Sequence, residues 1–489
     1  MAAGDRLRRL AATCVLAGSA CTAAAQALPD PAEPPEPAPV VRRVDDRRPA
    51  QPTTVQIAGQ GIELSGSWEY GDEQRQEFDL DPQRARDRRV RGHEVKLEAK
   101  AQLGAQLTAF VQLVALHETR KTEGTLQAQR NQSLERGEAW LQWDRLGGSG
   151  FGLQVGRVPL IDRRSWWWDD DLDALRLRYD GGAWLLDTGL ARTVARVSSA
   201  QAGIDPAERG VRRWFGNLRW EWSRRHTLEL FWLQQQDRSG APVAGTAWPA
   251  AGDADPDTSD LQARWSGLRA AGQWRAPAFR LAYWADAAWL RGREASTAEA
   301  TSAAGVDVAG TTAQRRLRSH AWDLGATLAL EAALRPSLTL GYARGSGGER
   351  SDALDTHFRQ TGLHENKARL GGVKRLQMYG ELLQPDLSNL AVGTVGAGVR
   401  LLGNSSIELV WHDYRQVVPY TTVAAARLSA QPEGLNRQLG RELGVAVALR
   451  EWSWLELTLR WSRFSPGPAY AANRREPAHA LEVGAELNF

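Results

Sequence analysis

Hydrophobic and polar side chains alternate along most of this chain from about Val55 onward. Such alternation places successive side chains on opposite faces of an extended strand, one apolar and one polar. After the first 25 residues no run of 18 apolar residues occurs, which excludes a helical membrane protein. Eighteen alternating segments are predicted strands: residues 57–70, 91–102, 105–117, 136–143, 151–158, 172–180, 184–195, 212–222, 226–236, 260–275, 279–291, 319–331, 337–344, 390–401, 405–415, 440–450, 454–463 and 480–489.

The connections between these segments are alternately short and long. Outer-membrane barrels have this pattern, with short periplasmic turns and longer outer loops. The long connections are residues 71–90, 118–135, 159–171, 196–211, 237–259, 292–318, 345–389, 416–439 and 464–479. The short ones lie near Leu103, Gly147, Gly181, Ser223, Ala276, Arg335, Gly403 and Trp452. The sequence therefore predicts an all-β fold, a transmembrane antiparallel β-barrel of about 18 strands.

The longest connection, residues 345–389, is predicted to be one outer excursion. Within it, Arg375 to Leu383 is compatible with one or two helical turns. The alternative is a hidden hairpin, which would raise the number of strands to 20. The sequence pattern leaves both possibilities open.

The two ends of the chain fit the same architecture. Ala480 to Phe489 alternates and finishes on an aromatic residue, as outer-membrane barrels usually do. Arginines, an apolar run and an Ala-rich stretch predict a cleaved signal peptide at 1–25. Residues 26–54 are Pro-rich and predict an extended periplasmic linker, followed by the barrel at 55–489. Both cysteines lie in the signal, so the remaining chain has no thiol chemistry.

Alternation also predicts which charged side chains face the lumen. A charge facing lipid near the midplane would cost about 2–4 kcal/mol, so charged positions of each strand are assigned inward. The inward set comprises both bases and acids, including Lys96, Arg176, Arg178, Arg219, Glu456 and Arg460. A barrel of 16 to 18 strands leaves an aqueous channel, so these residues predict a pore. Each single arginine is also compatible with a structural ion pair, whereas the set favours a cationic constriction.

The segment Trp166-Trp167-Trp168-Asp169-Asp170-Asp171 has two interpretations. One is a sugar-stacking platform with an acidic cluster. The other is an interfacial aromatic belt followed by a solvated loop. The second is favoured for the aspartates, while the tryptophans are compatible with both. The eight histidines show no ligand spacing, so neither a metal nor a cofactor is predicted.

Four sets of residues between about 150 and 480 carry a family resemblance. They are Gly156-Arg157 with Trp166-Trp167-Trp168-Asp169 and Leu172-Asp173-Ala174-Leu175-Arg176; Phe358-Arg359-Gln360-Thr361-Gly362-Leu363-His364-Glu365-Asn366; Tyr379-Gly380-Glu381-Leu382 with Leu387-Ser388-Asn389-Leu390; and Phe464-Ser465-Pro466-Gly467-Pro468-Ala469-Tyr470. In combination they resemble the alginate export porins of Gram-negative bacteria. Each segment alone is weak.

The resemblance implies an 18-stranded monomeric barrel in the bacterial outer membrane. It also implies passage of a polyanionic uronate chain from periplasm to exterior through a constriction lined with arginines. Arg157, Arg176, Arg178 and Arg460 are the positions where the resemblance places that lining, and Arg460 matches best because it precedes the Phe-x-Pro-Gly segment. Arg359 joins the tryptophans and Asp169 as loop candidates. Whether periplasmic secretion proteins take part is left open.

One feature departs from the family. Its members can carry a longer periplasmic loop between strands 16 and 17, able to cover the pore. Here the corresponding turn, Glu451 to Ser453, is only a few residues long. A plug at that place is therefore not expected, and the pore is either leakier or gated by an outer loop.

Two other classes of function are compatible with parts of the sequence. A solute-uptake porin would use the same architecture and is the alternative function. A barrel enzyme would need a Ser/His or Asp/His constellation, and His412 with Asp413 forms no recognisable one, so no catalytic activity is predicted. The formal charge of +3 falls toward neutral when the signal is removed, which gives no support for nucleic-acid binding.

Overall fold

The structure is a computed structural model of the full chain. It describes residues 52–489 except 58, 84–86, 124–127, 241, 248–256, 302–306, 349 and 352. The predicted signal peptide at 1–25 and nearly all of the predicted linker lie outside the described residues. The domain boundaries therefore stay predictions.

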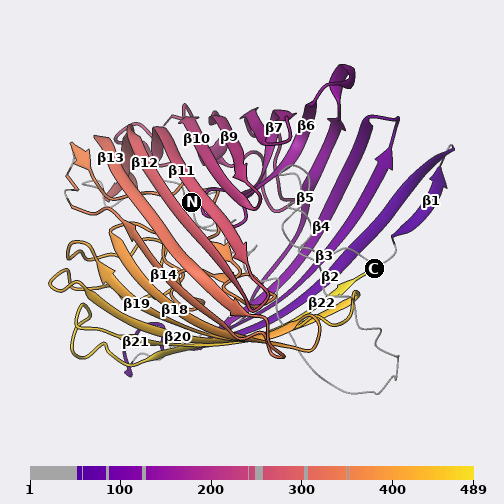
Figure 1. The fold of residues 1–489 in the computed structure, drawn as a ribbon. Coiled ribbons are helices and arrows are strands. Elements are labelled where there is room, and N and C mark those ends of the chain that lie inside the picture. The colour runs from indigo at the N-terminus through magenta and orange to yellow at the C-terminus, as the bar shows by residue number, and fades with distance from the viewer. Residues whose placement is uncertain are drawn as a thin grey trace.

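Eighteen long antiparallel strands form a closed barrel, as the sequence predicts (Figure 1). Each strand pairs with its neighbours in chain order, and β22 returns to pair with β2, from Ser67 opposite Asn488 to Gln76 opposite His479. The C-terminal Phe489 completes this seam by exchanging two backbone hydrogen bonds with Gly66, of 2.9 and 3.0 Å. Alternating side chains and a terminal strand that meets the first one thus leave the barrel without a free edge.

The barrel strands agree closely with the predicted segments. They are β2 (Gln60–Gln76), β3 (Arg88–Gln102), β4 (Leu107–Thr122), β5 (Gln129–Trp143), β6 (Phe151–Ile161), β7 (Asp169–Asp180), β8 (Trp184–Ala191), β9 (Arg212–Ser223), β10 (His226–Gln236), β11 (Ser259–Arg275), β12 (Phe279–Thr301), β13 (Asp307–Leu330), β14 (Ser337–Gly345), β18 (Leu390–Leu401), β19 (Ser405–Gln416), β20 (Gln438–Leu449), β21 (Leu455–Pro466) and β22 (Ala478–Asn488). Several strands extend beyond the prediction at their outer ends, most of all β12 and β13.

Short elements accompany the barrel. A short strand, β1 (Thr53–Ile57), forms a hairpin with the start of β2, through a turn that contains Gly59 at a positive φ of 79°. The first predicted segment, 57–70, therefore began too early, because its first residue belongs to β1. The helical segments of the described residues are two 3-10 turns, η1 (Leu146–Gly148) and η2 (Pro206–Glu208). No helix among the described residues is long and apolar enough to cross a membrane.

The described residues of the segment 345–389 contain no further membrane-spanning strand. β14 pairs directly with β18 over nine register pairs, so the ring keeps 18 strands and the hidden hairpin is excluded. The segment holds three two-residue strands, β15 (Leu354–Asp355), β16 (Lys367–Ala368) and β17 (Leu376–Gln377). Between Arg375 and Leu383 the chain forms β17 followed by turns, and not a helix.

The two faces of the wall differ as the alternation predicts. On β7, Leu175 is 49% exposed on the outer face whereas Arg176 is 2% exposed inside. On β21, Leu459 is 41% exposed and Glu456 is 2% exposed. Outward apolar side chains form a band for the lipid, and inward polar side chains meet the lumen.

The interior contains a large apolar core in addition to polar side chains. Inward aromatic and aliphatic residues of β9 to β12, such as Phe215, Phe231 and Trp265, are buried against residues of two connections that fold into the barrel. One connection lies between β6 and β7 and carries the three tryptophans. The other is the long segment between β14 and β18. The fold therefore places two chain segments inside the lumen, where they define the candidate site.

Candidate functional site

The segment 346–389, called the inner loop below, is held inside the barrel by wall carboxylates and hydroxyls. The N–H of Gly372 donates to Glu408 (3.0 Å), and the N–H of Val373 donates to Ser406 (3.0 Å). The N–H groups of Leu382 and Leu383 both donate to Glu442, at 2.8 and 3.0 Å. Buried backbone N–H groups need partners, and here inward side chains of β19 and β20 provide them in place of a strand.

Ion pairs add to this attachment. Lys374 of the inner loop lies 2.6 Å from Glu456 on β21, and Arg450, just after β20, lies 3.1 Å from the same carboxylate. Arg450 also donates to the carbonyl of Val373 at 2.7 Å. Glu456, predicted to line the path, is thus a buried anchor between two cations.

Arg460, the best-matched predicted lining residue, contacts both the wall and the inner loop. Its Nη1 donates to Glu482 on β22 at 3.0 Å and lies 3.7 Å from Glu381 of the inner loop. Its side chain is 14% exposed. A guanidinium shared by two carboxylates in this way braces the loop against β21 and β22.

Arg359, a predicted loop candidate, secures the beginning of the inner loop. It forms a bidentate pair with Glu294 on β12, at 2.6 and 2.8 Å, and a third bond of 2.9 Å to Asp355. On the neighbouring strand, the indole N–H of Trp265 donates to the carbonyl of Arg359 at 2.9 Å. The inner loop therefore contacts β11, β12, β19, β20 and β21, and it also contacts β13 and β14 through Asp323 and Thr339.

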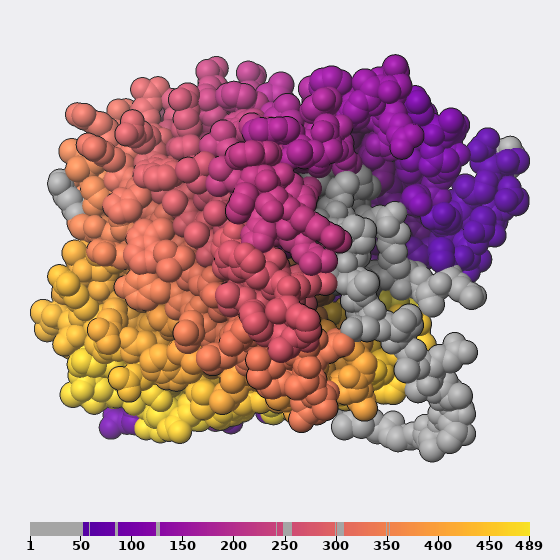
Figure 2. Space-filling view, viewed as in Figure 1, coloured from indigo at the N-terminus to yellow at the C-terminus, as the bar shows by residue number. Residues whose placement is uncertain are grey.

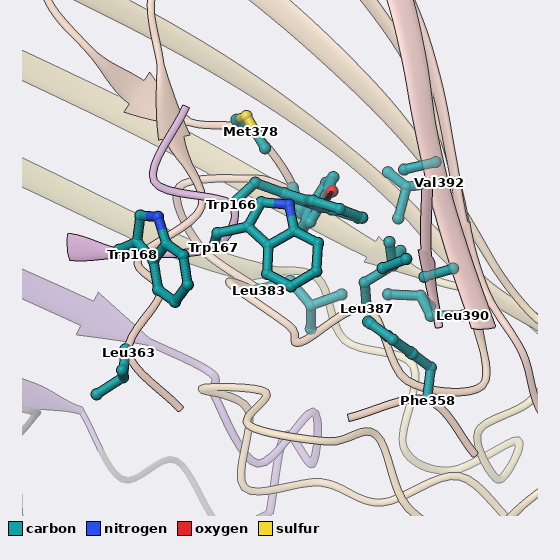
Figure 3. Close-up of a cluster of buried hydrophobic side chains, with 14 of the residues drawn as sticks. Trp166, Trp167, Trp168, Phe358, Leu363, Met378, Leu383, Leu387, Leu390 and Val392 are labelled. Atoms are coloured by element: carbon teal, nitrogen blue, oxygen red, sulfur yellow. Dashed lines mark hydrogen bonds between the residues drawn. The ribbon is translucent and has the colours of Figure 1, made fainter. Parts of the chain in front are cut away.

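The three tryptophans lie inside the barrel and not at its surface (Figure 3). Trp166, Trp167 and Trp168 are only 1–3% exposed. Trp167 stacks on Phe231 with ring centroids 5.1 Å apart, and Trp168 packs near Phe215. The interpretation as an interfacial belt followed by a solvated loop is therefore wrong, because the segment turns inward and its rings complete the core against β9 and β10.

Asp162 explains why this segment turns inward. Its carboxylate accepts the N–H groups of Arg164 (2.8 Å), Trp167 (2.8 Å) and Trp168 (3.2 Å). Burial alone would raise the pKa of Asp162, but Arg269 at 2.9 Å and these three N–H groups hold the pKa below its usual range. One ionised carboxylate thus folds the chain around itself and joins it to β11.

The tryptophan segment and the inner loop bind each other. Trp166 donates from its indole N–H to the hydroxyl of Tyr379 (2.8 Å), which in turn donates to Asp323 on β13 (2.9 Å). Thr361 donates to the carbonyl of Trp167 at 2.6 Å. In Figure 3, Trp166 and Trp167 lie on the side of Leu383 and Leu387, which belong to the same buried cluster. The tryptophan segment and the inner loop are therefore connected by hydrogen bonds and share one buried cluster.

Asp169, the remaining loop candidate, lies at the outer end of β7 and contacts the inner loop. Its N–H donates to the carbonyl of Leu363 at 2.5 Å, and its carboxylate accepts from Ser165 at 2.6 Å. Arg375 lies 3.7 Å away. Asp171 is buried as well, in β7, so the aspartates do not form a solvated loop.

The other predicted lumen residues lie on the opposite wall, which is formed by β3 to β9. Arg176 is fixed in a structural contact: its Nε donates to Asp187 at 2.6 Å and its Nη1 to the carbonyl of Pro159 at 2.9 Å. Arg157 is buried and lies opposite Asp173 in the ladder between β6 and β7. Asp173 also accepts a bidentate pair from Arg136, at 2.7 and 2.8 Å.

Arg178, Arg219 and Lys96 are the more accessible members of that wall. Arg178 and Arg219 are half-buried near the periplasmic ends of β7 and β9. Within the part of the chain that the structure describes, no hydrogen-bond partner lies within reach of the buried Nε of Arg178. Lys96 on β3 lies between Glu69 (2.7 Å) and Glu94 (2.5 Å). The predicted cations other than Arg460 therefore share one side of the barrel, although they lie at different heights and form no single ring.

A buried charge cluster under the tryptophans was not predicted. Arg269 on β11 contacts Asp286 on β12 (2.5 Å) as well as Asp162, and Arg164 contacts Asp323 (2.7 Å). Arg269, Asp286 and Asp323 are direct neighbours in register across β11, β12 and β13. A signal in the sequence could have identified this cluster. Arg269, Asp286 and Asp323 are inward charged residues of consecutive strands and lie at similar distances from the short turns. Among the described residues, no three His, Cys, Asp or Glu side chains converge as metal ligands would.

Comparisons with known proteins were made for sequence and for structure. A family model described as "Alginate export" matches residues 61–483. "Alginate production protein AlgE" of Pseudomonas aeruginosa is 24% identical over 350 residues, covering 68% of this chain and 69% of that protein. The protein of the same name from Pseudomonas syringae pv. tomato is 24% identical over 396 residues, covering 73% of this chain and 76% of that protein.

Solved structures of outer-membrane porins resemble the barrel. Pseudomonas aeruginosa OccD3 (OpdP) superposes with a TM-score of 0.51 and 12% identity, covering 90% of this chain and 93% of that one. OpdK of Pseudomonas aeruginosa, solved with vanillate, superposes with a TM-score of 0.51 and 12% identity, covering 87% and 98%. At this identity the likeness concerns the fold alone.

Proposed function

The chain belongs to the alginate export family and to the outer membrane, and from that premise we propose a passive porin that exports an anionic, uronate-containing polysaccharide such as alginate. The observation that carries the proposal is the family match over residues 61–483, which spans nearly the whole barrel. The relatives are named for alginate production, and the proposal assigns no catalytic step.

We place the polymer path between the inner loop and the opposite wall of β3 to β9. Three observations support this position. The inner loop is attached to β11–β14 and β19–β21, whose inward acids are engaged in holding it. Arg157, Arg176, Arg178, Arg219 and Lys96 all lie on the other side of the ring. Their positions at successive heights suit an extended chain better than a compact solute.

The chemistry of a uronate polymer fits such a wall. Each sugar carries a carboxylate, and fixed guanidinium groups lower the barrier for its entry. Acids beside the cations, such as Glu69 and Asp187, keep binding weak enough for release. Arginine stays charged at every physiological pH, so the path does not depend on protonation. The sequence contains no Walker-type nucleotide-binding loop, so the energy for moving the polymer through the pore would come from its synthesis.

The inner loop takes the role of pore cover in this proposal. The turn between β20 and β21, where the family can carry a longer periplasmic loop, is only five residues long here, Arg450 to Trp454. The inner loop comes from the outer side and is anchored near that turn through Arg450. We also propose a monomeric barrel, a signal peptide at 1–25 and a periplasmic linker at 26–54.

Planar bilayer recordings on the refolded barrel test this function. An exporter should conduct anions preferentially, and oligo-uronates at micromolar to millimolar concentration should block the current. Neutral oligosaccharides of equal length serve as the matched ligand control. A pore without anion preference that ignores oligo-uronates would contradict the proposal and favour the alternative, a solute-uptake porin.

A further inference from the structure

Five arginines form a compact group on the outer face of β11, β12 and β13. Arg264 lies directly opposite Arg291, and Arg291 lies directly opposite Arg318. On the next rung outward, Arg293 lies opposite Arg316. All five side chains are exposed. They are called the arginine ladder below.

The ladder faces the membrane and not the lumen. It shares the parity of Leu268, Trp289 and Leu324, which are 42–47% exposed on the lipid side of the same three strands. The alternate residues, among them Trp265 and Leu290, are buried inside the barrel. In Figures 1 and 2 this part of the wall faces the viewer and presents an uncovered outer surface.

The position of Trp289 indicates where the ladder lies relative to the membrane. Trp289 lies one rung below, between Ser266 and His320. From Phe279, at the periplasmic end of β12, to Trp289 a tilted strand rises about 25 Å, which matches the apolar band of such barrels. Tryptophan marks the edge of that band, so the ladder begins where the headgroups of the outer leaflet lie.

Four other outward arginines at this end of the barrel have acidic partners. Arg415 and Arg441 contact Asp413 at 2.8 and 3.3 Å. Arg89 and Arg91 contact Asp72, at 2.5 and 3.0 Å. These two groups are neutralised in part within the protein itself.

The ladder has no such neutralisation among the described residues. The side-chain contacts of its members are with glutamines: Arg264 donates to Gln234 (3.3 Å), and Arg293 donates twice to Gln262 (2.9 and 2.6 Å). The acid nearest in register on this face, Asp260, lies two rungs above Arg264 and accepts the N–H of Gly240. Like charges placed directly opposite across strands are destabilising, so the row needs an anion from outside the protein.

We propose that the arginine ladder is a binding site for a phosphorylated lipid of the outer leaflet, with phosphate groups held by the guanidinium groups and acyl chains packed below on Leu268, Trp289 and Leu324. Guanidinium pairs with phosphate bidentately, and the first rung spans about 10 Å across three strands. A lipid fits this surface better than a free anion because the cations adjoin an apolar band on one wall.

The test uses the full-length barrel purified in detergent and titrated with fluorescent lipid A. The triple variant Arg264→Gln, Arg291→Gln, Arg318→Gln should lose about tenfold or more in affinity. The matched control, Arg415→Gln with Arg441→Gln, removes two outward arginines that already contact Asp413 and should change affinity less than about twofold. Single-channel conductance equal to that of the wild type confirms that both variants are folded.

Two further probes separate the sources of phosphate. Dephosphorylated lipid A should bind about as weakly to the wild type as intact lipid A binds to the triple variant. Inorganic phosphate at millimolar concentration should not displace the lipid. Equal binding of intact and dephosphorylated lipid, or equal affinity of wild type and triple variant, would overturn the proposal. Displacement by inorganic phosphate would overturn it also, and would leave a general anion site.

Discussion

The two sides of the barrel wall use their inward charges differently. On β19 to β21, the acids Glu408, Glu442 and Glu456 each contact the inner loop. On the opposite wall, Arg176 is tied to Asp187, while Arg178 lies half-buried nearer the periplasmic end of the same strand. Both sides alternate in the same way along the sequence, so alternation determines which residues face inward but not what they contact.

In the proposed exporter, this difference separates attachment of the inner loop from transport of the polymer. Acids that accept backbone N–H groups position those stretches of the inner loop that pair with no strand, such as Gly372 and Leu382-Leu383. On the far side, the half-buried Arg178 is the cation that the proposed path would use first, because its Nε has no hydrogen-bond partner among the described residues. The comparison predicts that substitutions on the loop side alter stability and conductance, whereas substitutions on the opposite wall alter uronate binding.

The largest effect is expected for Asp162→Ala. The substitution leaves the N–H groups of Trp167 and Trp168 without their acceptor and removes one partner of the buried Arg269. Breaking such a buried contact costs about 3–5 kcal/mol. Denaturant titration of the refolded barrel measures the loss. The control Asp180→Ala removes an exposed turn carboxylate that accepts from Gly182 and should cost less than about 1 kcal/mol. Equal losses in the two variants would contradict the role given to Asp162.

Release of the inner loop should follow from Glu442→Ala. This carboxylate accepts from Leu382, from Leu383 and from the hydroxyl of Tyr414. Its removal should weaken the attachment by about 3 kcal/mol, since each bond to a charged group contributes about 1.5–3 kcal/mol. Single-channel conductance should rise and become noisier, with Glu442→Gln intermediate because an amide oxygen still accepts. Unchanged conductance in Glu442→Ala would show that the inner loop does not limit the pore.

A smaller effect is expected on the opposite wall. Arg178→Ala should weaken block by oligo-uronates about threefold, as loss of one half-exposed cation contact would. The current noise of Arg178→Ala should equal that of the wild type. Lys374→Ala on the loop side should show the reverse, with noisier current and little change in block, because Lys374 holds Glu456. If both variants lose uronate block equally, the two walls do not differ in function.

Raising the salt concentration should affect the two sides of the wall differently. Raising ionic strength from about 0.1 M to 1 M shortens the Debye length from about 10 Å to 3 Å. Uronate block at the opposite wall should therefore weaken steeply in the wild type and less steeply in Arg178→Ala. The dry contacts of Asp162 and Glu442 are screened far less, so the stability losses above should persist at high salt.

The sequence predicted the wall well and the interior poorly, for physical reasons. A strand repeats every two residues, so alternation and short turns locate every barrel strand without knowledge of its neighbours. The inner loop has no such period, and its position depends on partners such as Glu442, about 60 residues away in the chain. Trp166 to Trp168 carry the composition of an interfacial belt, and their inward position depends on partners elsewhere in the chain, such as the carboxylate of Asp162 and the hydroxyl of Thr361.

The sequence also identified candidate cations without their partners. Alternation placed Arg460 and Glu456 inside, but their contacts with Glu381 and Lys374 come from a loop whose path was unknown. Arg359 was noted through a motif, and its bidentate contact with Glu294 became visible only in the folded chain. Pairing in register across β11 to β13 would have revealed Arg269 beforehand.

Cysteine protection tests most directly whether the polymer follows the opposite wall. Cys14 and Cys21 both lie in the predicted signal peptide, so Arg178→Cys would carry a single reactive thiol in the mature barrel. The account predicts that oligo-uronates slow its modification by a small charged thiol reagent, while modification of Leu402→Cys, in the exposed turn between β18 and β19, continues unchanged. Equal rates at Arg178→Cys with and without oligo-uronates would contradict passage along this wall.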